Sequence, residues 1–341
     1  MTEWRRGYTS SWRVRRVDPE TWLPGEELKG VDSVTVKMES GDNAPLLESG
    51  EMGVDGKIDE GWYRIEALAS QGGGTLGTLA TLLFSSDGSE WSHRSWGGSV
   101  TGKSVLALAS EKKLEPGSYA PKGVDGARWC ADMLRSCIPS PVNVDGSFIL
   151  SNHVVLDFGS SALDAVWAVL DAAGWCMQVD GFGEVTVMPK PTEPALEITE
   201  SNKGLLMPSF SRSLPIEDVP NVIRVYEDGL MAECVNDDPD SPTSTVARGR
   251  RIEAVEENPT RVDGETLAAY AKRRLVELSD IYETLDVERE YADGVMPYSV
   301  VRMRLAEPGI SGDFAVQSQT LTCSRGIKVG ETLGRRSGWK G

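Results

Sequence analysis

The last third of the chain alternates short strand-like segments with one amphipathic helix, and this pattern constrains the fold most. Residues 221–226 predict a strand, which Asp228-Gly229 turns back into a second strand over 230–235. Apolar residues recur at helical spacing over 265–278, and Asp263 is the expected N-cap of that helix. Four more strand-like segments follow, at 285–291, 299–305, 314–320 and 326–329. A β-rich unit crossed by one helix is typical of a scaffold, because no catalytic residue types converge in it.

Two Pro- and Gly-rich segments, at 115–123 and 189–194, divide the rest of the chain. Short strand-like segments precede the first, and a region that mixes helical and strand patterns separates the two. We therefore expect five regions: a β-rich domain at 1–115, a small α/β domain at 124–190, a connecting segment at 195–218, a second β-rich domain with a crossing helix at 219–333, and a basic tail at 334–341.

The α/β region carries clear helix signals. Asp125 is placed to cap a helix that runs to about Cys137. Residues 161–164 fit a capping box for a second helix, which Gly174 is expected to end. A hairpin over 175–188 follows, and its turn is expected at Asp180-Gly181-Phe182-Gly183.

Four segments, taken in order, resemble parts of one known family, the baseplate hub (tail hub) proteins of tailed phages. Residues 219–225 are similar to the strand that opens the second barrel of those hubs, and 267–278 to the helix that crosses it. Residues 307–316 resemble the closing hairpin, and 165–187 resemble the middle domain. The resemblance extends over about residues 125–333 as an order of elements and is looser over 1–115.

This resemblance implies an α+β, β-rich fold, in which two β-barrel-like domains related to tail-tube folds flank the small α/β domain. It implies a structural virion protein, made late, that forms a homotrimeric ring at the distal end of the tail tube. The ring would adapt the sixfold tube to a threefold tip and leave a channel for DNA. No enzymatic activity and no cofactor are expected. Candidate subunit-interface residues lie on the opening strand and the closing hairpin: Asn221, Ile223, Val225, Ile310, Phe314 and Val316.

The same resemblance implies the partners: further copies of the chain, the tail-tube protein, distal tail or baseplate proteins, and a tip or spike protein. The expected location is the virion tail tip, after synthesis and assembly in the host cytoplasm. Because no apolar run approaches the length of about 20 residues that a spanning helix needs, we expect no membrane insertion.

The charge balance disfavours a nucleic-acid-binding groove. The chain has 35 Lys and Arg against 52 Asp and Glu, a formal net charge of −17. Phosphate binding requires clustered basic side chains. An acidic lining would instead let DNA pass through a ring without specific binding.

Metal and disulfide chemistry are not expected. The five cysteines are odd in number and form no CxxC pair, and the chain has only His93 and His153 as histidines. A zinc site would lack its usual ligands. Cys130 and Cys137 share a face of the expected helix, and we favour interpreting them as two small core residues.

One motif suggests an alternative function. Residues 97–104 satisfy the P-loop pattern, with Gly97, Gly102, Lys103 and Ser104 as candidate nucleotide-binding residues. A P-loop follows a buried strand and opens a sizeable helix, whereas polar and aromatic residues precede this motif and Pro116 stops the apolar run after it. We favour a structural turn at 97–104 and keep a nucleotide-binding protein as the alternative.

Tryptophan suggests a second alternative. Six of the ten tryptophans fall in the first hundred residues, which would suit a sugar-stacking, cell-wall carbohydrate-binding module. Tryptophan is also common in cores and at subunit interfaces, and this is the favoured interpretation.

Overall fold

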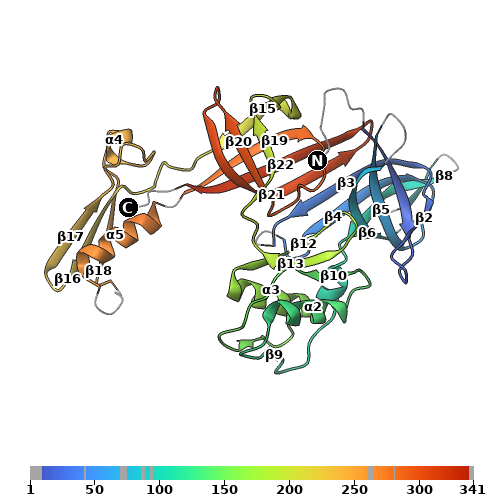
Figure 1. The fold of residues 1–341 in the computed structure, drawn as a ribbon, viewed down its shortest axis with the longest axis horizontal. Coiled ribbons are helices and arrows are strands. Elements are labelled where there is room, and N and C mark those ends of the chain that lie inside the picture. The colour runs from blue at the N-terminus through green and yellow to red at the C-terminus, as the bar shows by residue number, and fades with distance from the viewer. Residues whose placement is uncertain are drawn as a thin grey trace. The chain divides into compact units, whose positions relative to one another are not determined.

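The structure is a computed structural model that describes residues 10–41, 44–69, 75–85, 89–92, 95–259, 265–279 and 281–337 (Figure 1). The chain divides into two compact units. Unit 1 comprises residues 1–210 and 287–333, and unit 2 comprises residues 211–286 and 334–341. Three strands cross the boundary along the chain: β15 (Leu206–Ser213), β19 (Ile281–Glu290) and β22 (Ile327–Ser337).

A large, mostly antiparallel sheet dominates the described residues, and its strands follow the order β15-β19-β22-β21-β3-β4-β8-β6-β5-β1-β2. Three strands lie off this path: β14 pairs with β20, β20 pairs with β21, and β7 pairs with β8. The N-terminal strands are β1 (Ser10–Val17), β2 (Pro24–Glu27), β3 (Val31–Glu39), β4 (Glu48–Asp55), β5 (Gly61–Ala69), β6 (Thr75–Phe84), β7 (Ser89–Ser92) and β8 (Ser95–Lys103). The later ones are β14 (Pro194–Thr199), β20 (Val300–Leu305) and β21 (Ile310–Cys323).

One strand pair joins the first third of the chain to the last. β21 pairs with β3 in antiparallel register from Ser318 opposite Glu39 to Cys323 opposite Val34. Fully buried apolar residues from both thirds, including Val36, Ile65 and Leu321, pack into one core. The expected β-rich fold is confirmed. The described strands form no closed barrel, because the large sheet runs continuously from β2 to β15.

A buried ion pair lies in the C-terminal part of unit 1. The Arg289 guanidinium contacts both carboxylate oxygens of Glu331, at 2.8 Å from Nε and 2.6 Å from Nη2. Both side chains are only 1% exposed, and the Gln319 amide donates to the same carboxylate at 2.7 Å. A pair that is bidentate and further hydrogen-bonded satisfies charges that would be costly if left alone in the interior.

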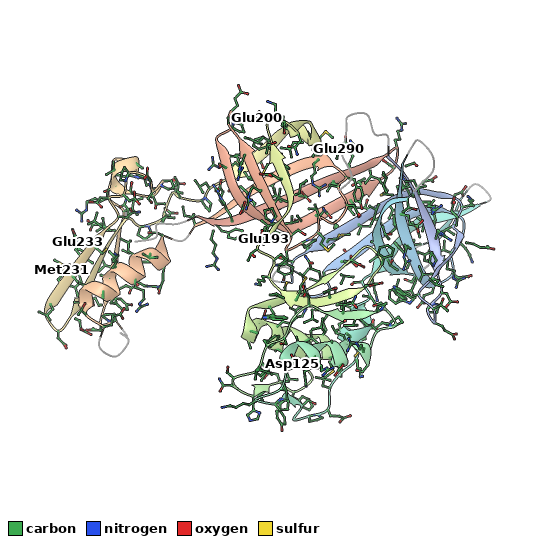
Figure 2. All side chains as sticks on the ribbon, in the orientation of Figure 1. Asp125, Glu193, Glu200, Met231, Glu233 and Glu290 are labelled. Carbon is green, nitrogen blue, oxygen red and sulfur yellow. The ribbon has the colours of Figure 1, made fainter. Side chains whose placement is uncertain are left out.

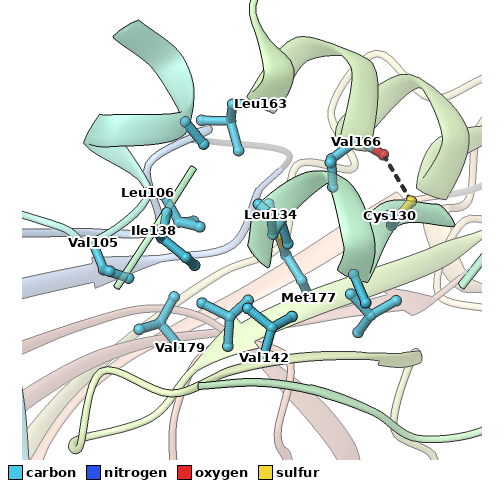
Figure 3. Packing of buried hydrophobic residues seen from close by; sticks show 14 of the residues in the cluster. Val105, Leu106, Cys130, Leu134, Ile138, Val142, Leu163, Val166, Met177 and Val179 are labelled. Carbon is cyan, nitrogen blue, oxygen red and sulfur yellow. Dashed lines mark hydrogen bonds between the residues drawn. The ribbon is translucent and has the colours of Figure 1, made fainter. Parts of the chain in front are cut away.

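The α/β region of unit 1 has a three-stranded sheet with helices on one face (Figure 1). Its elements are α1 (Ala107–Glu111), β9 (Tyr119–Ala120), α2 (Gly126–Arg135), β10 (Val142–Val144), β11 (Val154–Val155), α3 (Ala162–Ala173), β12 (Trp175–Val179) and β13 (Val185–Pro189). Figure 3 shows its core, in which Leu134, Val166 and Met177 interdigitate and the Cys130 thiol donates to the Val166 carbonyl at 3.8 Å.

The caps of this region match the sequence. Asp125 caps α2 by accepting from the amides of Ala127 and Arg128. Ser161 and Asp164 form the predicted capping box of α3, and Gly174 ends the helix with a φ of 68°. These confirmed signals are local, since each depends on residues at most four positions apart.

Unit 2 contains a second three-stranded sheet, in the order β17-β16-β18, with α5 against one face. Ile223 and Val225 of β16 pack on Tyr270 and Leu275 of α5. Asp228 and Gly229 form the expected turn between β16 and β17. The N-cap of α5 is Thr266 and not the expected Asp263, which lies outside the described residues. The elements are β16 (Val222–Glu227), β17 (Leu230–Val235), α4 (Thr245–Arg248), β18 (Glu253–Glu257) and α5 (Leu267–Leu278).

Two expectations about residues 195–333 differ from the structure. The segment 195–218 is not a plain connection, because it contains β14, the 3-10 turn η1 (Lys203–Leu205) and β15. The helix does not cross a barrel formed by 219–333, since residues 287–333 belong to unit 1 while α5 packs on the small sheet of unit 2. Local pattern predicted the strands, but their partners were set by contacts between distant segments.

Within the described part of the chain, no helix has the length and apolar character required to span a membrane.

Candidate functional sites

The P-loop-like segment is a paired strand. Residues 97–103 lie in β8, which pairs with β4 on one side and with β7 and then β6 on the other. A Cβ on Gly102 would lie 2.8 Å from the Phe84 ring, so this glycine serves close packing. Because the backbone amides belong to the sheet ladder, they do not form the open loop that cradles phosphates.

The other P-loop candidates have structural contacts as well. Lys103 is exposed, and its ammonium lies 3.9 Å from the Glu111 carboxylate. Ser104 is fully buried, and its hydroxyl accepts from the Leu106 amide at 3.3 Å. The helix that follows, α1, has five residues. The segment is thus a strand and not the expected turn, and its geometry offers no phosphate site.

The six candidate interface residues are core residues of the single chain. Asn221, Ile223 and Val225 are 0% exposed, and β16 is the central strand of its sheet. The Asn221 side chain accepts from the Ile252 amide at 2.7 Å and donates to the Arg250 carbonyl at 2.9 Å, so it fixes the loop before β18. Ile310, Phe314 and Val316 of β21 are at most 1% exposed. Their place in an assembly stays a prediction, but they present no side-chain surface to a neighbouring subunit.

The tryptophans do not form an exposed row where their side chains are described. Trp22 and Trp62 are buried, and their ring centroids lie 5.3 Å apart. Trp12, Trp129, Trp167 and Trp175 are half-buried. Trp4 and Trp339 lie outside the described residues, as does His93.

No group of three or more His, Cys, Asp or Glu in the described ranges is arranged to hold a metal ion. Burial raises the pKa of the Cys130 thiol to about 12, as expected for a core thiol and not for a nucleophile.

The turn at Asp180-Gly183 packs against the large β-sheet of unit 1. A Cβ on Gly181 would lie 1.8 Å from the Thr78 carbonyl oxygen, so only glycine fits. The Phe182 carbonyl accepts from the Trp22 indole at 2.7 Å and from Arg64 at 3.2 Å. Burial lowers the pKa of Arg64, but the guanidinium still has hydrogen-bonded partners. This contact fixes the α/β region on the sheet.

A cleft of about 430 Å³ lies beside this turn, and its polar lining includes Asp180, Tyr291 and Asp293. The Asp180 carboxylate accepts from the amides of Phe182 and Glu184, each at 2.9 Å, and Asp293 accepts from the Tyr291 hydroxyl at 2.9 Å. Burial raises the pKa of Asp180. These hydrogen bonds hold the loops in place, which is a structural role.

The outer sheet face of unit 2, which we define as Arg224, Tyr226, Met231, Glu233, Glu253 and Val255, points away from α5. Figure 2 labels Met231 and Glu233 on this sheet. Tyr226, Met231 and Val255 are 40%, 55% and 57% exposed. Arg224 links Glu233 and Glu253, each at 2.9 Å. An apolar centre beside a polar network is typical of a surface that contacts another protein.

No family model and no curated protein matches the sequence. Solved structures do match over nearly the whole chain. A tail protein from Neisseria meningitidis is 14% identical with a TM-score of 0.60, and the match covers 96% of this chain and 97% of that one. The chain has the fold of phage tail proteins.

Two further tail proteins share this fold. The 43 kDa tail protein of prophage MuSo2 from Shewanella oneidensis is 11% identical, with a TM-score of 0.56 and coverage of 94% of this chain and 97% of its own. The prophage tail protein gp18 from Listeria monocytogenes is 12% identical, with a TM-score of 0.50 and coverage of 94% of both chains. The expected relation to phage tail proteins is confirmed at the level of the fold.

Sequence reasoning missed the residues that hold the molecule together. Arg64 and Trp22 lie far in sequence from Phe182, which they bind. The available signal was the turn at Asp180-Gly181-Phe182-Gly183: the hairpin predicted there is confirmed, but its contact with the large sheet was not predicted. The outer face of unit 2 was readable in principle from β16, because the exposed Tyr226 follows the buried Val225 in that strand. In β17, Met231 and Glu233 are exposed and the residues between and after them, Ala232 and Cys234, are half-buried.

Proposed function

We propose that the chain is a structural tail hub, whose copies form a ring at the distal end of a phage tail tube. The observation that carries this proposal is the match of nearly the entire chain to phage tail proteins. The alternative of nucleotide binding at residues 97–104 has no support in the geometry, since residues 97–103 lie in a paired strand.

The large continuous sheet suits a structural protein of an assembly. Because β21 pairs with β3, strands from the first and last thirds of the chain lie in one sheet of unit 1. Three copies would supply six β-rich segments, two from each chain, and so match a sixfold tube above a threefold tip. The net charge of −17 suits a central channel that DNA traverses without binding.

We propose that a neighbouring subunit covers the outer face of unit 2. The face combines an aromatic and a methionine side chain with an Arg-Glu network, a composition common in interfaces. Both outer strands of this sheet, β17 and β18, have one edge without a described partner strand. Ring closure would cover such edges, which otherwise invite uncontrolled pairing.

Two matched variants test this surface. Met231→Glu places a charge in the apolar centre of the outer face. We expect it to raise the dissociation constant for self-association at least tenfold, as determined by mass measurement over a range of protein concentrations. Leu23→Glu changes a residue that is also exposed, 65% against 55%, but lies in unit 1, and it should leave assembly unchanged. Equal assembly of both variants would show that the outer face is not the interface.

The partners follow from the position of a hub: the tail-tube protein on one side, and a tip or spike protein with distal tail or baseplate proteins on the other. Mixing the purified chain with the tube protein encoded beside it should give a complex of fixed stoichiometry. If the tube protein shows no binding in any oligomeric state, the proposed position in the virion is wrong.

A further inference from the structure

One carboxyl group in the described structure is buried without a partner. Glu48, at the start of β4, is 4% exposed, and neither of its carboxylate oxygens has a hydrogen-bond partner. It follows Leu47, whose φ of 60° is uncommon for a branched residue and directs the chain sharply into the strand. A buried polar group with no partner is rare in folded proteins, because its desolvation is uncompensated.

The Glu48 carboxyl lines a junction of three segments within unit 1. A cavity of about 10 Å³, room for about one water molecule, is lined by Glu48 and Leu47, by Met177–Val179 of β12, and by Met296–Tyr298. Hydrogen bonds close the junction: the Gln178 amide donates to the Pro297 carbonyl at 2.7 Å, and the Gly41 amide donates to the Tyr298 hydroxyl at 2.8 Å. The lining is otherwise mostly apolar.

The charged and titratable groups around this junction do not neutralise an ionised Glu48. Glu39, from the end of β3, lines the same cavity, and the carboxylate of Asp180, which follows β12, disfavours ionisation of Glu48. On the third segment the titratable group is the Tyr298 phenol, and the Lys190 ammonium lies 5.8 Å from the centroid of that ring. Arg64 donates its hydrogen bonds to Thr81, Trp22 and Phe182.

We propose that Glu48 is a proton-operated latch, which keeps the α/β region closed on the sheet while the carboxyl is neutral and loosens it when the carboxyl ionises. An ionised carboxylate in this apolar space lacks hydrogen-bond donors, so the chain would have to open the junction to water. Burial, and then the charge of Asp180, hold the pKa of Glu48 well above its usual value.

The direction of the pH effect follows from this. In the unfolded chain Glu48 ionises near its ordinary pKa of 4.5, while the folded chain retains the proton to higher pH. The unfolded state therefore binds fewer protons in this window, and stability falls as pH rises. Relative to a chain without the carboxyl, the unfolding equilibrium constant should rise about tenfold per pH unit until the folded group ionises.

The test compares the full-length protein with Glu48→Gln by denaturant unfolding from pH 5 to pH 9. The ratio of their unfolding constants should rise with pH, and at pH 9 residues 40–48 and 175–182 should exchange amide hydrogens faster in the unmodified protein than in the variant. Glu39→Gln makes the same chemical change in the same cavity at a half-buried residue, and it should keep the pH dependence of the unmodified protein.

A ratio that does not change with pH would overturn the proposal. Glu48→Leu provides a second replacement that suits an apolar lining and should be tolerated at every pH. If both variants fail to fold, the carboxyl makes an essential interaction and the latch is also wrong. The test uses a single purified chain, so its result is independent of the proposed ring.

Discussion

The two small sheets of this chain share a plan, three strands with helix on one face, but differ in what the opposite face contacts. In the α/β region the opposite face of β12 contacts the rest of unit 1, as the hydrogen bond from Gln178 to Pro297 shows. In unit 2 the opposite face is the exposed outer face with Tyr226 and Met231. The same local architecture thus serves as an internal support in one place and leaves a free surface in the other.

The two sheets also differ in the buried clusters that stabilise them. The α/β region shares one buried cluster with Val17 and Trp62 of the N-terminal strands. The core of unit 2 is a small separate cluster around Ile223 and Leu275. We therefore expect damage to the first to spread through unit 1 and damage to the second to stay local.

The largest effect is expected at Gly181. Gly181→Ala forces a Cβ to within 1.8 Å of the Thr78 carbonyl oxygen, so the turn must leave its place on the sheet. We expect a loss of about 3 kcal/mol in the free energy of unfolding, measured by denaturant titration.

Gly204→Ala is the matched control, because a Cβ at Gly204 meets no atom within 4 Å. If the two alanine variants are equally stable, the turn does not anchor the α/β region.

The next effect is expected in unit 2. Leu275→Ala removes a fully buried side chain from α5, and a cost of about 2 to 3 kcal/mol follows from the lost contacts and the cavity. Hydrogen exchange should accelerate in residues 211–286 and remain unchanged in the α/β region. The exposed Lys272→Ala on the same helix is the control. Acceleration throughout unit 1 would contradict the local character of this core.

Sequence predicted best what is decided locally. The Asp125 cap, the Ser161–Asp164 capping box and the Gly174 terminus of α3 all occur as expected, because side chains within one turn determine them. The strand around Ile223 was also predicted. The packing of this strand against α5 was not predicted, because alternation shows that a strand has a buried face but does not show which helix or subunit covers that face.

Sequence failed where pairing is long-range. The contact of β21 with β3 joins residues about 280 positions apart, and no local signal specifies it. The glycines of 97–104 suggested a phosphate loop, whereas Gly102 makes room for the Phe84 ring. No sequence pattern near Glu48 reveals that its side chain is buried.

A smaller effect is expected at the cap of α3. Ser161→Ala removes the hydroxyl that accepts from the Asp164 amide, and it should cost about 1 kcal/mol at neutral pH. Thr266→Ala, at the cap of α5, gives the corresponding value for unit 2. If both variants lower the free energy of unfolding by less than about 0.3 kcal/mol, neither N-cap contributes measurably to the stability of its helix.

The same cap has a pH dependence. The hydrogen bond from the Ser161 amide lowers the pKa of Asp164. This stabilisation is therefore present above the ordinary Asp pKa of 3.8 and is lost as pH falls through the lowered value. Asp164→Asn should make the cap insensitive to acid between pH 5 and pH 2. An unchanged acid response, followed by circular dichroism, would mean that other carboxylates dominate.

The smallest effect is expected on the outer face. Arg224→Met breaks exposed contacts to Glu233 and Glu253 and should change the stability of the single chain by less than about 1 kcal/mol. Its effect on self-assembly should exceed its effect on unfolding. The opposite order would assign the network to the fold of unit 2 and not to an interface.

The most direct test of the hub proposal is imaging of the purified protein, with its mass measured in the same sample, alone and mixed with the tail proteins encoded beside it. Threefold rings with a central channel, having the mass of three chains plus any bound partner, are the predicted result. A compact monomer that remains monomeric with all of those proteins would contradict the proposal.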